Sequence, residues 1–556
     1  MSTEPNTVTV SQEDAGLPMS PKWDPEKLAA EQAALRELET LPLGKRSWGY
    51  IKRTGPGLLQ SAMTLGAGSA TASVLAGASF GYKLLWVQPL AMFFGVMMLG
   101  ALSNVVLTRG ERPYESFGKR VWKPLVFLWA LGTILSSVIW HFPQYALLAG
   151  AGRDLATMGG LGVSVAEGAA TPGWIQSMAS ALAPLGIEIN TQITTLGYLV
   201  SFGVGGLILA MNIFMVFSYG KSVRGVKIYE RFLRTMIALV IFFFLLVCVL
   251  NFKNIDWLEI WRGFTGYYGF PKNPETGQVD AATYLQTLGM LGAAVGINMT
   301  FLYPYSLLAK GWGAEHKKLA RWDLGMTMFL PFTIVTSLII IAMTVTGVYP
   351  GAEGVDVVQT QLKPLGAAAA FQGIPGGRLI FCLGLMGMCG GAVSTHMVAC
   401  GFTLCEMLGG KMTAKRFRLF ALTPCIGVLG VVISLPMWFP VVASAVCFTM
   451  LPIAYFIFFW LNNDKGYIGS ATGKGWRRAL FNVILIAALI FACIGSFVSL
   501  KKNVFDKFAQ PKAASTPVVE IEDHAPLGAP QDEATSESDA VMETLVETHE
   551  SEQAPR

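Results

Sequence analysis

The chain has 556 residues, of which 53% are hydrophobic and only 14% are charged. Soluble domains usually carry about 25% charged residues, so the composition excludes an ordinary soluble protein and predicts that lipid surrounds most of the chain. The net charge of +5 indicates no nucleic-acid partner, because the bases lie in short segments between apolar runs and the carboxyl-terminal segment is acidic.

Three segments differ in composition along the chain. Residues 1–50 are polar, and the stretch at 27–41 predicts a short surface helix. A cleavable signal peptide is not expected there, because the segment lacks a basic start followed by an apolar core. Residues 51–500 form the predicted transmembrane domain. Residues 501–556 are acidic, rich in Pro, Ser, Thr and Glu, and have no apolar period, so we expect a disordered tail.

Eleven apolar segments are long enough to cross the hydrocarbon core of a bilayer, which takes about 20 helical residues. They run over residues 55–79, 84–108, 124–150, 195–218, 233–251, 282–309, 324–348, 377–407, 417–435, 437–461 and 479–500. The sequence therefore predicts an all-α integral membrane protein of about eleven transmembrane helices, with membrane lipid as its surroundings.

Basic residues predict the orientation of these helices. Lys and Arg accumulate in the segments that follow the second, fourth, sixth, eighth and tenth spans, whereas the long segments at 152–194 and 252–281 are poor in bases. Because cytoplasmic loops carry the excess of Lys and Arg, we expect a cytoplasmic amino terminus in a multi-pass protein of a bacterial inner membrane. An odd number of spans then places the tail on the outer side.

The first and sixth spans are interrupted. In the first, Gly66 and Gly68 flank Ala67 at mid-membrane depth, and in the sixth, Gly296 and Asn298 precede a proline. Two weak helices five spans apart are typical of inverted five-helix repeats, whose unwound centres expose free backbone groups to a solute. The alternative interpretation is that small residues only allow close helix packing.

The residues around these interruptions carry a family resemblance. Gly55-Pro56-Gly57, followed by residues 76–87, resembles the first two helices of the Nramp divalent-metal transporters. The resemblance covers residues 50–500 in helix order. It implies a LeuT-type fold of two inverted five-helix repeats plus one helix, with helices 1 and 6 broken, and transport of a divalent metal cation.

The sequence departs from the family at the metal ligands. The family's Asp-Pro-Gly-Asn motif falls on residues 66–69, so the carboxylate and the amide are missing, and its Met-Pro-His motif falls on about 298–300. That placement removes the sulfur from its expected position unless the alignment shifts by one residue. The family's acids of helix 3 fall near residues 140–144, where no acid remains.

The candidate binding residues at the two breaks are all uncharged. They are Gly66, Ala67, Gly68, Ser69, Gly296, Asn298, Met299 and Thr300. A divalent cation in a low-dielectric site usually has at least one carboxylate ligand, which offsets its charge. These neutral donors are typical of a site for a hydrated ion or a polar organic solute rather than a high-affinity site for Mn²⁺ or Fe²⁺. No residue is therefore assigned as a metal ligand.

A second group of polar residues at membrane depth provides candidates for ion coupling or for lining the solute path. They are His141, Gln144, Tyr303, Ser394, Thr395 and His396. A histidine in a membrane span is a candidate proton carrier or ligand, whereas the alternative for His141 is a neutral ring bonded to a carbonyl that Pro143 frees.

The leading hypothesis is therefore an Nramp-related secondary transporter that moves its solute by alternating access, coupled to H⁺ or Na⁺. By resemblance the solute is a divalent metal cation, but the site is non-standard and uncharged. The alternatives are a coupled transporter of a small polar organic solute and a sensor or scaffold that has lost transport. No catalytic motif occurs in the chain, so neither an enzymatic activity nor a cofactor is expected.

Overall fold

The computed structural model describes residues 25–163, 171–185, 188–219, 223–272, 277–279, 281–345, 377–433 and 447–501. Within these residues the protein is a bundle of helices, and a lone antiparallel bridge between Ile189 and Ile433 is its only extended pairing. Residues 1–24 and 502–556 lie outside the described part, so the predicted disorder of the tail stays a prediction.

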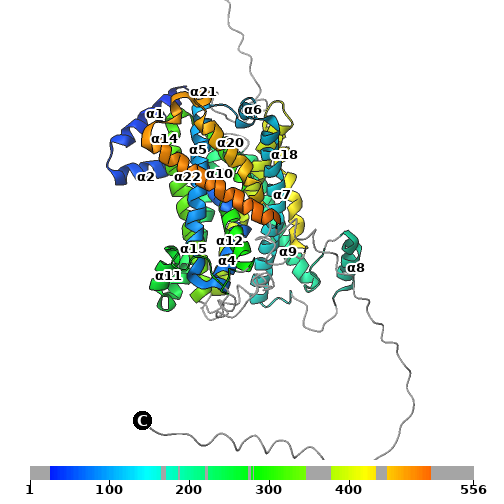
Figure 1. The fold of residues 1–556 in the computed structure, drawn as a ribbon. Coiled ribbons are helices and arrows are strands. Elements are labelled where there is room, and N and C mark those ends of the chain that lie inside the picture. The colour runs from blue at the N-terminus through cyan, green and yellow to red at the C-terminus, as the bar shows by residue number, and fades with distance from the viewer. Residues whose placement is uncertain are drawn as a thin grey trace, which may run out of the picture. The chain divides into compact units, whose positions relative to one another are not determined.

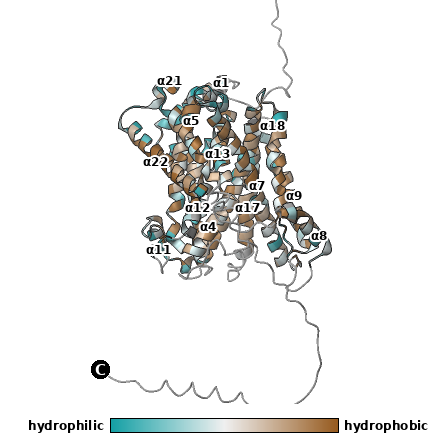
Figure 2. Ribbon diagram, turned by 45° about the vertical axis from the view of Figure 1, so that its right-hand side comes forward, coloured by the Kyte–Doolittle hydropathy of each residue, from teal (hydrophilic) through white to brown (hydrophobic). Residues whose placement is uncertain are grey.

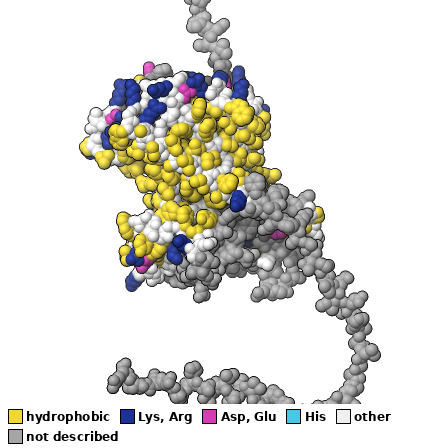
Figure 3. Space-filling model, in the orientation of Figure 1, with side chains coloured by type: hydrophobic (Ala, Val, Ile, Leu, Met, Phe, Trp, Pro, Cys, Tyr) yellow, Lys and Arg dark blue, Asp and Glu magenta, His cyan; other side chains and the backbone are white. Residues whose placement is uncertain are grey.

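Eight helical stretches of the described chain are long and apolar enough to cross a membrane. They comprise α5 (Val87–Arg109), α7 (Lys123–Met158), α9 (Thr195–Tyr219), α10 (Val223–Leu250), α12 with α13 (Ala281–Ala294 and Ile297–Ala309), the run that includes α14, η6 and α15 (Lys317–Asp323, Leu324–Phe329 and Leu330–Val345), α17 (Gly377–Met407) and α22 (Gly475–Leu500). Apolar residues dominate these helices (Figure 2) and form a wide band across the face of the bundle that Figure 3 shows. The prediction of an all-α membrane protein is confirmed.

The three remaining predicted spans depart from continuous long helices. The first is split into α3 (Pro56–Thr64) and α4 (Ala67–Phe80). The ninth consists of α18 (Ala414–Ala421) and the 3₁₀ helix η7 (Thr423–Val431). The tenth is represented by a shorter apolar helix, α20 (Leu451–Asn463), and residues 434–446 lie outside the described part.

Glycines explain why η7 can lie directly against α7. A Cβ atom added at Gly427 would lie 2.2 Å from the Cβ atom of His141, and one at Gly430 would lie 2.2 Å from the carbonyl oxygen of Phe142. Only a residue without a side chain allows this approach, as at many helix contacts in membranes. In the sequence these glycines belong to what looks like an ordinary apolar span. In the structure they allow the 3₁₀ helix η7 to pack against α7.

The two ends of the bundle differ in their short elements. The helices α6 (Pro113–Gly118), α18 and α21 (Lys465–Ile468) lie at one end, and α8 (Gly173–Leu182) and α11 (Trp257–Phe264) lie at the other (Figure 1). Lys and Arg side chains gather at the end that carries α18 and α21 (Figure 3). We call this the basic end. A hairpin of α1 (Pro25–Thr40) and α2 (Leu43–Arg53) also packs there. The sequence predicted a helix at 27–41, which corresponds to α1, but not α2 or the hairpin.

Candidate solute site at two helix breaks

The first break lies between α3 and α4, at Leu65 and Gly66. The helix α3 ends at Thr64, and Gly66 is extended with φ −134° and ψ −162° before α4 begins. The freed backbone groups find partners: the Ala67 N–H donates to Oε1 of Gln144 at 2.9 Å, and the Gly66 N–H lies 3.2 Å from Oγ of Ser69. Because α7 supplies Gln144, the break is held open by a neighbouring helix rather than closed into a continuous helix.

The second break lies between α12 and α13, at Val295 and Gly296. Gly296 is extended with φ −95° and ψ 162°, and its N–H donates to the sulfur of Met299 at 3.3 Å. The Met299 N–H in turn donates to Oδ1 of Asn298 at 3.0 Å. Side chains of the first helical turn therefore cap the start of α13 in place of the missing backbone partners.

A buried cavity of about 30 Å³ lies between the two breaks. Its lining comes from α3, α4, α7, α12, α13 and α17 and consists of Met63, Thr64, Gly68, Ser69, Trp140, Gln144, Gly292, Ala293, Gly296, Asn298, Met299 and His396. About 10–15 Å³ of such free space is enough to hold one water molecule. In this conformation the cavity therefore admits water or a small ion.

Polar contacts join the breaks across this cavity. The Thr64 hydroxyl donates to the carbonyl oxygen of Ala294 at 2.7 Å and lies 3.3 Å from the sulfur of Met299. On the far side, Nδ2 of Asn298 lies 3.0 Å from Nδ1 of His396 on α17. A solute in the cavity would therefore meet a hydroxyl, an amide, a thioether and an imidazole together with the free backbone groups.

Seven predicted residues line this cavity: Gly68, Ser69, Gln144, Gly296, Asn298, Met299 and His396. Gly66 and Ala67 lie at the first break beside the cavity but are not among its lining residues. The Ala67 N–H donates to Gln144. The placement of the family's Met-Pro-His motif removed the sulfur of Met299 from its expected position. In the structure this sulfur lies at the cavity and contacts both breaks.

The other predicted residues point elsewhere. The Thr300 hydroxyl accepts from Nε1 of Trp129 at 2.8 Å, and the Tyr303 hydroxyl lies 3.5 Å from the carbonyl of Ala320. Ser394 accepts from the Tyr229 hydroxyl. Thr395 donates to a carbonyl of its own helix, that of Ala392, at 2.7 Å. These four side chains therefore do not form the cavity wall.

The two membrane histidines meet at the edge of the site. The rings of His141 and His396 are 5.7 Å apart and nearly perpendicular, and both are buried. His141 does not line the cavity, and its Nε2 atom lies 3.1 Å from the carbonyl oxygen of Val393 on α17. A carbonyl accepts from an N–H, so this contact favours a proton on Nε2.

Five lining residues were missed as site candidates: Met63, Thr64, Trp140, Gly292 and Ala293. Met63 and Thr64 occupy the last turn of α3, and Gly292 and Ala293 occupy the last turn of α12. The available signal for these four was their place immediately before a break, since residues on both sides of an interruption can face its gap. Trp140 lies on α7 and precedes no break.

The cavity offers no charged ligand. None of its lining residues is Asp or Glu, and the described part of the chain contains no cluster of three or more His, Cys, Asp or Glu side chains that could hold a metal ion. The nearest approach to a metal-ligand set is the nitrogen of His396 with the sulfurs of Met63 and Met299 on the same lining. Such a set can bind a cation only through neutral donors.

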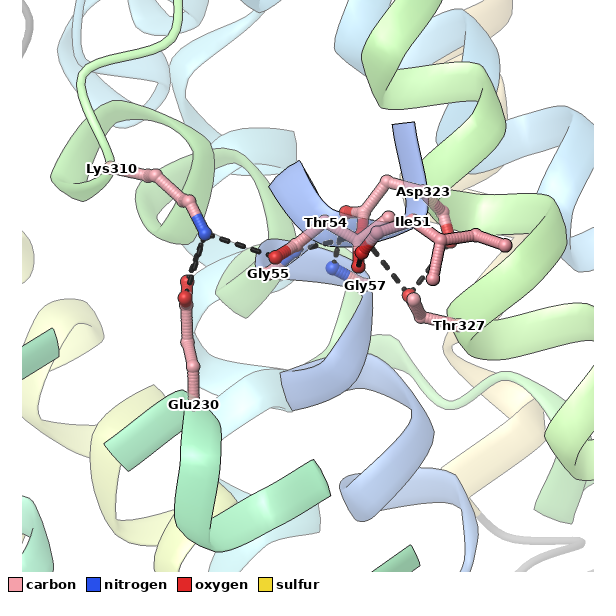
Figure 4. Close-up of polar contacts among 8 residues, drawn as sticks. All are labelled: Ile51, Thr54, Gly55, Gly57, Glu230, Lys310, Asp323 and Thr327. Atoms are coloured by element: carbon pink, nitrogen blue, oxygen red, sulfur yellow. Dashed lines mark hydrogen bonds and ion pairs between the residues drawn. The ribbon is translucent and has the colours of Figure 1, made fainter. Parts of the chain in front are cut away.

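Charged groups lie instead at the basic end, where α3 begins (Figure 4). The buried carboxylate of Asp323 accepts hydrogen bonds from the N–H groups of Gly55 at 3.0 Å and Gly57 at 2.6 Å. It thereby caps the first turn of α3 with a negative charge, which the helix dipole favours. A Cβ atom at Gly57 would lie 2.3 Å from Oγ1 of Thr327, so this approach requires glycine.

An ion pair lies beside this cap. Nζ of Lys310, at the end of α13, contacts the carboxylate of Glu230 on α10 at 2.7 Å and the carbonyl oxygen of Thr54 at 3.1 Å (Figure 4). The ends of α3 and α13 that lie away from the breaks are therefore bonded to each other and to α10. We call these contacts of Asp323, Glu230 and Lys310 the basic-end clasp.

Comparisons with known proteins agree with this architecture. The family model described as natural resistance-associated macrophage protein-like, or Nramp, matches residues 57–499. A mutant of the Eremococcus coleocola manganese transporter superposes with a TM-score of 0.59 at 15% identity, over 85% of this chain and 91% of that one. The same transporter in complex with an aromatic bis-isothiourea substituted compound gives 0.58 at 13% identity, over 90% and 92%. No curated protein matches in sequence.

Proposed function

The chain belongs to the Nramp family, which is a family of transporters and not of enzymes, and we propose that it carries a small cation by alternating access through the uncharged cavity between its two helix breaks. The observation that carries this proposal is that one cavity is lined from both breaks at once. Broken helices that expose backbone groups at mid-membrane depth are the usual means by which such folds hold a solute.

The cavity is suited to a small cation. Its free space of about 30 Å³, surrounded by polar donors, admits an ion that has exchanged part of its water shell for protein donors. The structures with which the chain superposes are named as manganese transporters, so a divalent metal cation is the substrate class that we propose.

The chemistry of the lining predicts how such a cation would bind. Neutral oxygen, nitrogen and sulfur donors can replace water around a metal ion but cannot offset its charge in a low-dielectric site. We therefore propose a site of low affinity, in which Asn298, Met299 and His396 supply side-chain donors. A solute with two positive charges would bind less tightly here than in a site that contains a carboxylate.

Alternating access would need the basic end to open. In this conformation the clasp joins the start of α3 to the end of α14, and the end of α13 to α10. We propose that release of the clasp lets α3 move relative to α10 and α13. The orientation that we expect makes this the cytoplasmic route, in agreement with the Lys and Arg side chains gathered at that end.

The coupling ion that we propose is H⁺ or Na⁺. The buried contact of His141 with His396 joins α7 to α17, and His396 lines the cavity beside Asn298. A proton on either ring would place a positive charge beside the site and repel a bound cation. Uptake driven by an imposed proton gradient would support H⁺, whereas uptake that follows only a sodium gradient would assign Na⁺.

Transport into proteoliposomes tests the proposal. Mn²⁺ and Mg²⁺ should enter, and Asn298→Ala should lower uptake, whereas the control Asn212→Ala should not, because Asn212 is equally buried in α9 but bonds only to its own helix at Ile208. Uptake of amino acids or amines instead of cations would support an organic solute. No movement of any solute under any gradient would contradict transport and favour a sensor or scaffold.

A further inference from the structure

The hairpin of α1 and α2 lies before the part of the chain that the family model matches, since it ends at Arg53 and the match begins at residue 57. Its two helices pack closely. A Cβ atom at Gly49 would lie 2.2 Å from a methyl carbon of Leu38, and Leu35, Leu38 and Tyr50 are buried. The hairpin is therefore an ordered addition to the bundle rather than a loose leader.

The hairpin is attached to α14 by polar and aromatic contacts. Nζ of Lys318 lies 2.7 Å from Oε2 of Glu39, and the rings of Tyr50 and Trp322 are stacked with centroids 5.6 Å apart. The helices α1, α2 and α14 lie together beside the basic end (Figure 1). This attachment places side chains of α2 opposite side chains of α14.

A groove of about 380 Å³ lies between the hairpin and α14. It is lined by Glu39, Arg46, Tyr50, Lys318, Arg321 and Trp322. Three of these six side chains are cationic and one is anionic, and that one is already paired with Lys318. The groove therefore carries excess positive charge beside the stacked rings of Tyr50 and Trp322.

Arg46 is the residue whose position calls for a ligand. Its Nε atom is buried and has no hydrogen-bond partner among the described residues, and neither Arg46 nor Arg321 forms an ion pair within the described part of the chain. A buried guanidinium N–H without a partner is costly unless an anion or water occupies the groove. Guanidinium groups bind phosphate through paired N–H donors, which makes a phosphate group the natural occupant.

The outer side of α2 indicates where such a phosphate would come from. Leu43 and Trp48 are 64% and 59% exposed, and Nζ of Lys52 lies 5.5 Å from the centre of the Trp48 ring. A short helix with exposed Leu and Trp among Lys and Arg is typical of one that lies in the interface of a bilayer. The same helix that supplies Arg46 to the groove is therefore suited to contact lipid.

We propose that this groove binds the phosphate headgroup of an anionic phospholipid from the leaflet at the basic end, through Arg46 and Arg321, while Leu43 and Trp48 enter the leaflet. The proposal is independent of the transported solute. The chain passes from α2 through Thr54 into the start of α3, which Asp323 at the end of α14 caps. A bound lipid would therefore hold the hairpin against α14.

Native mass spectrometry of the purified full chain tests the proposal. Phosphatidylglycerol should be retained in preference to phosphatidylcholine, and each of Arg46→Gln and Arg321→Gln should weaken its binding about fivefold, the value of one basic side chain at an anionic surface. The matched control is Lys45→Gln, because Lys45 is exposed on the same helix and does not line the groove.

Three results would overturn the proposal. Equal retention of the two lipids would exclude a headgroup site, and unchanged binding in a doubly substituted R46Q/R321Q chain would exclude this groove. Displacement of the lipid by an equal concentration of inorganic phosphate would indicate a site for soluble phosphate instead. Elution of each variant as a monodisperse species in size-exclusion chromatography separates loss of binding from loss of the fold.

Discussion

The cavity between the breaks and the clasp at the basic end differ in how they use charge. The cavity is lined by uncharged donors only, whereas the clasp contains two carboxylates and an ammonium group within one helix turn of the start of α3. Buried charge is tolerable where partners and helix ends satisfy it, and is costly at mid-membrane depth. In this chain the charged residues of the clasp therefore bond helix ends together, and neutral residues line the cavity.

The largest expected loss of stability comes from removing the cap of the clasp. Asp323→Ala leaves the N–H groups of Gly55 and Gly57 buried without partners, and should lower the free energy of unfolding by about 3 kcal/mol. The matched control is Asp256→Ala, which removes a similar cap from the exposed start of α11 and should cost about 1 kcal/mol. Denaturant unfolding in detergent measures both, and equal losses would contradict the importance of the clasp.

A methyl group added at the first break should give the second largest loss of stability. In Gly66→Ala the added Cβ atom would lie 2.5 Å from Nε2 of Gln144 and 2.8 Å from Cβ of Ala392, so overpacking should cost about 2 kcal/mol and impair uptake. Gly100→Ala in α5 is the control, since nothing lies within 4 Å of its added Cβ atom. Normal uptake by the Gly66 variant would show that the break does not need this close approach.

Replacing the sulfur of the second break should have a smaller effect on stability. Met299→Leu keeps the side-chain volume but leaves the Gly296 N–H without its acceptor, which should cost about 1 kcal/mol. If the sulfur also binds the solute, cation uptake should fall more than in Met98→Leu, a buried methionine of α5 outside the cavity. Parallel unfolding and uptake measurements separate the two roles, and equal uptake in both variants would remove Met299 from the site.

The smallest effect concerns an ion pair at the basic end. Hydrogen bonds from Arg120 hold the pKa of the Asp464 carboxyl below its ordinary value of 3.8. A lowered pKa in the folded state means that the carboxylate stabilises the fold above pH 3.8 and that this contribution disappears as the pH falls through the lower value. Asp464→Asn should therefore be slightly less stable at neutral pH and match the wild type in strong acid.

Unfolding measured across that pH range gives the test. A difference between Asp464→Asn and the wild type that stays constant down to strong acid would contradict the ion-pair explanation. Salt should also reduce the difference, since the pair is partly exposed and such pairs are screened.

Sequence patterns predicted the helical membrane fold and both breaks, because lipid requires apolar spans and because Gly66 and Gly296 weaken a helix wherever they occur. They did not predict that the ninth span contains a 3₁₀ helix, since its glycines act through contact with α7. The clasp was also missed. Asp323, Glu230 and Lys310 are far apart in sequence, and only the folded chain brings them together.

The site shows the same limit. Seven of the predicted residues line the cavity, yet Thr300, Tyr303, Ser394 and Thr395 do not, because helix phase decides which polar side chain faces a gap. A shift of one residue in the motif alignment decides where the Met299 sulfur falls. In the structure this sulfur contacts Thr64 at the first break.

The central claim, that a cation binds among neutral donors, is tested most directly by adding a charge to the cavity. Mn²⁺ uptake into proteoliposomes should be measured against Mn²⁺ concentration for the wild type and for Asn298→Asp. A carboxylate at this position should lower the half-saturating concentration by roughly tenfold, about 1.4 kcal/mol of binding. An unchanged half-saturating concentration, in a variant that folds and transports, would contradict a cation site at the helix breaks.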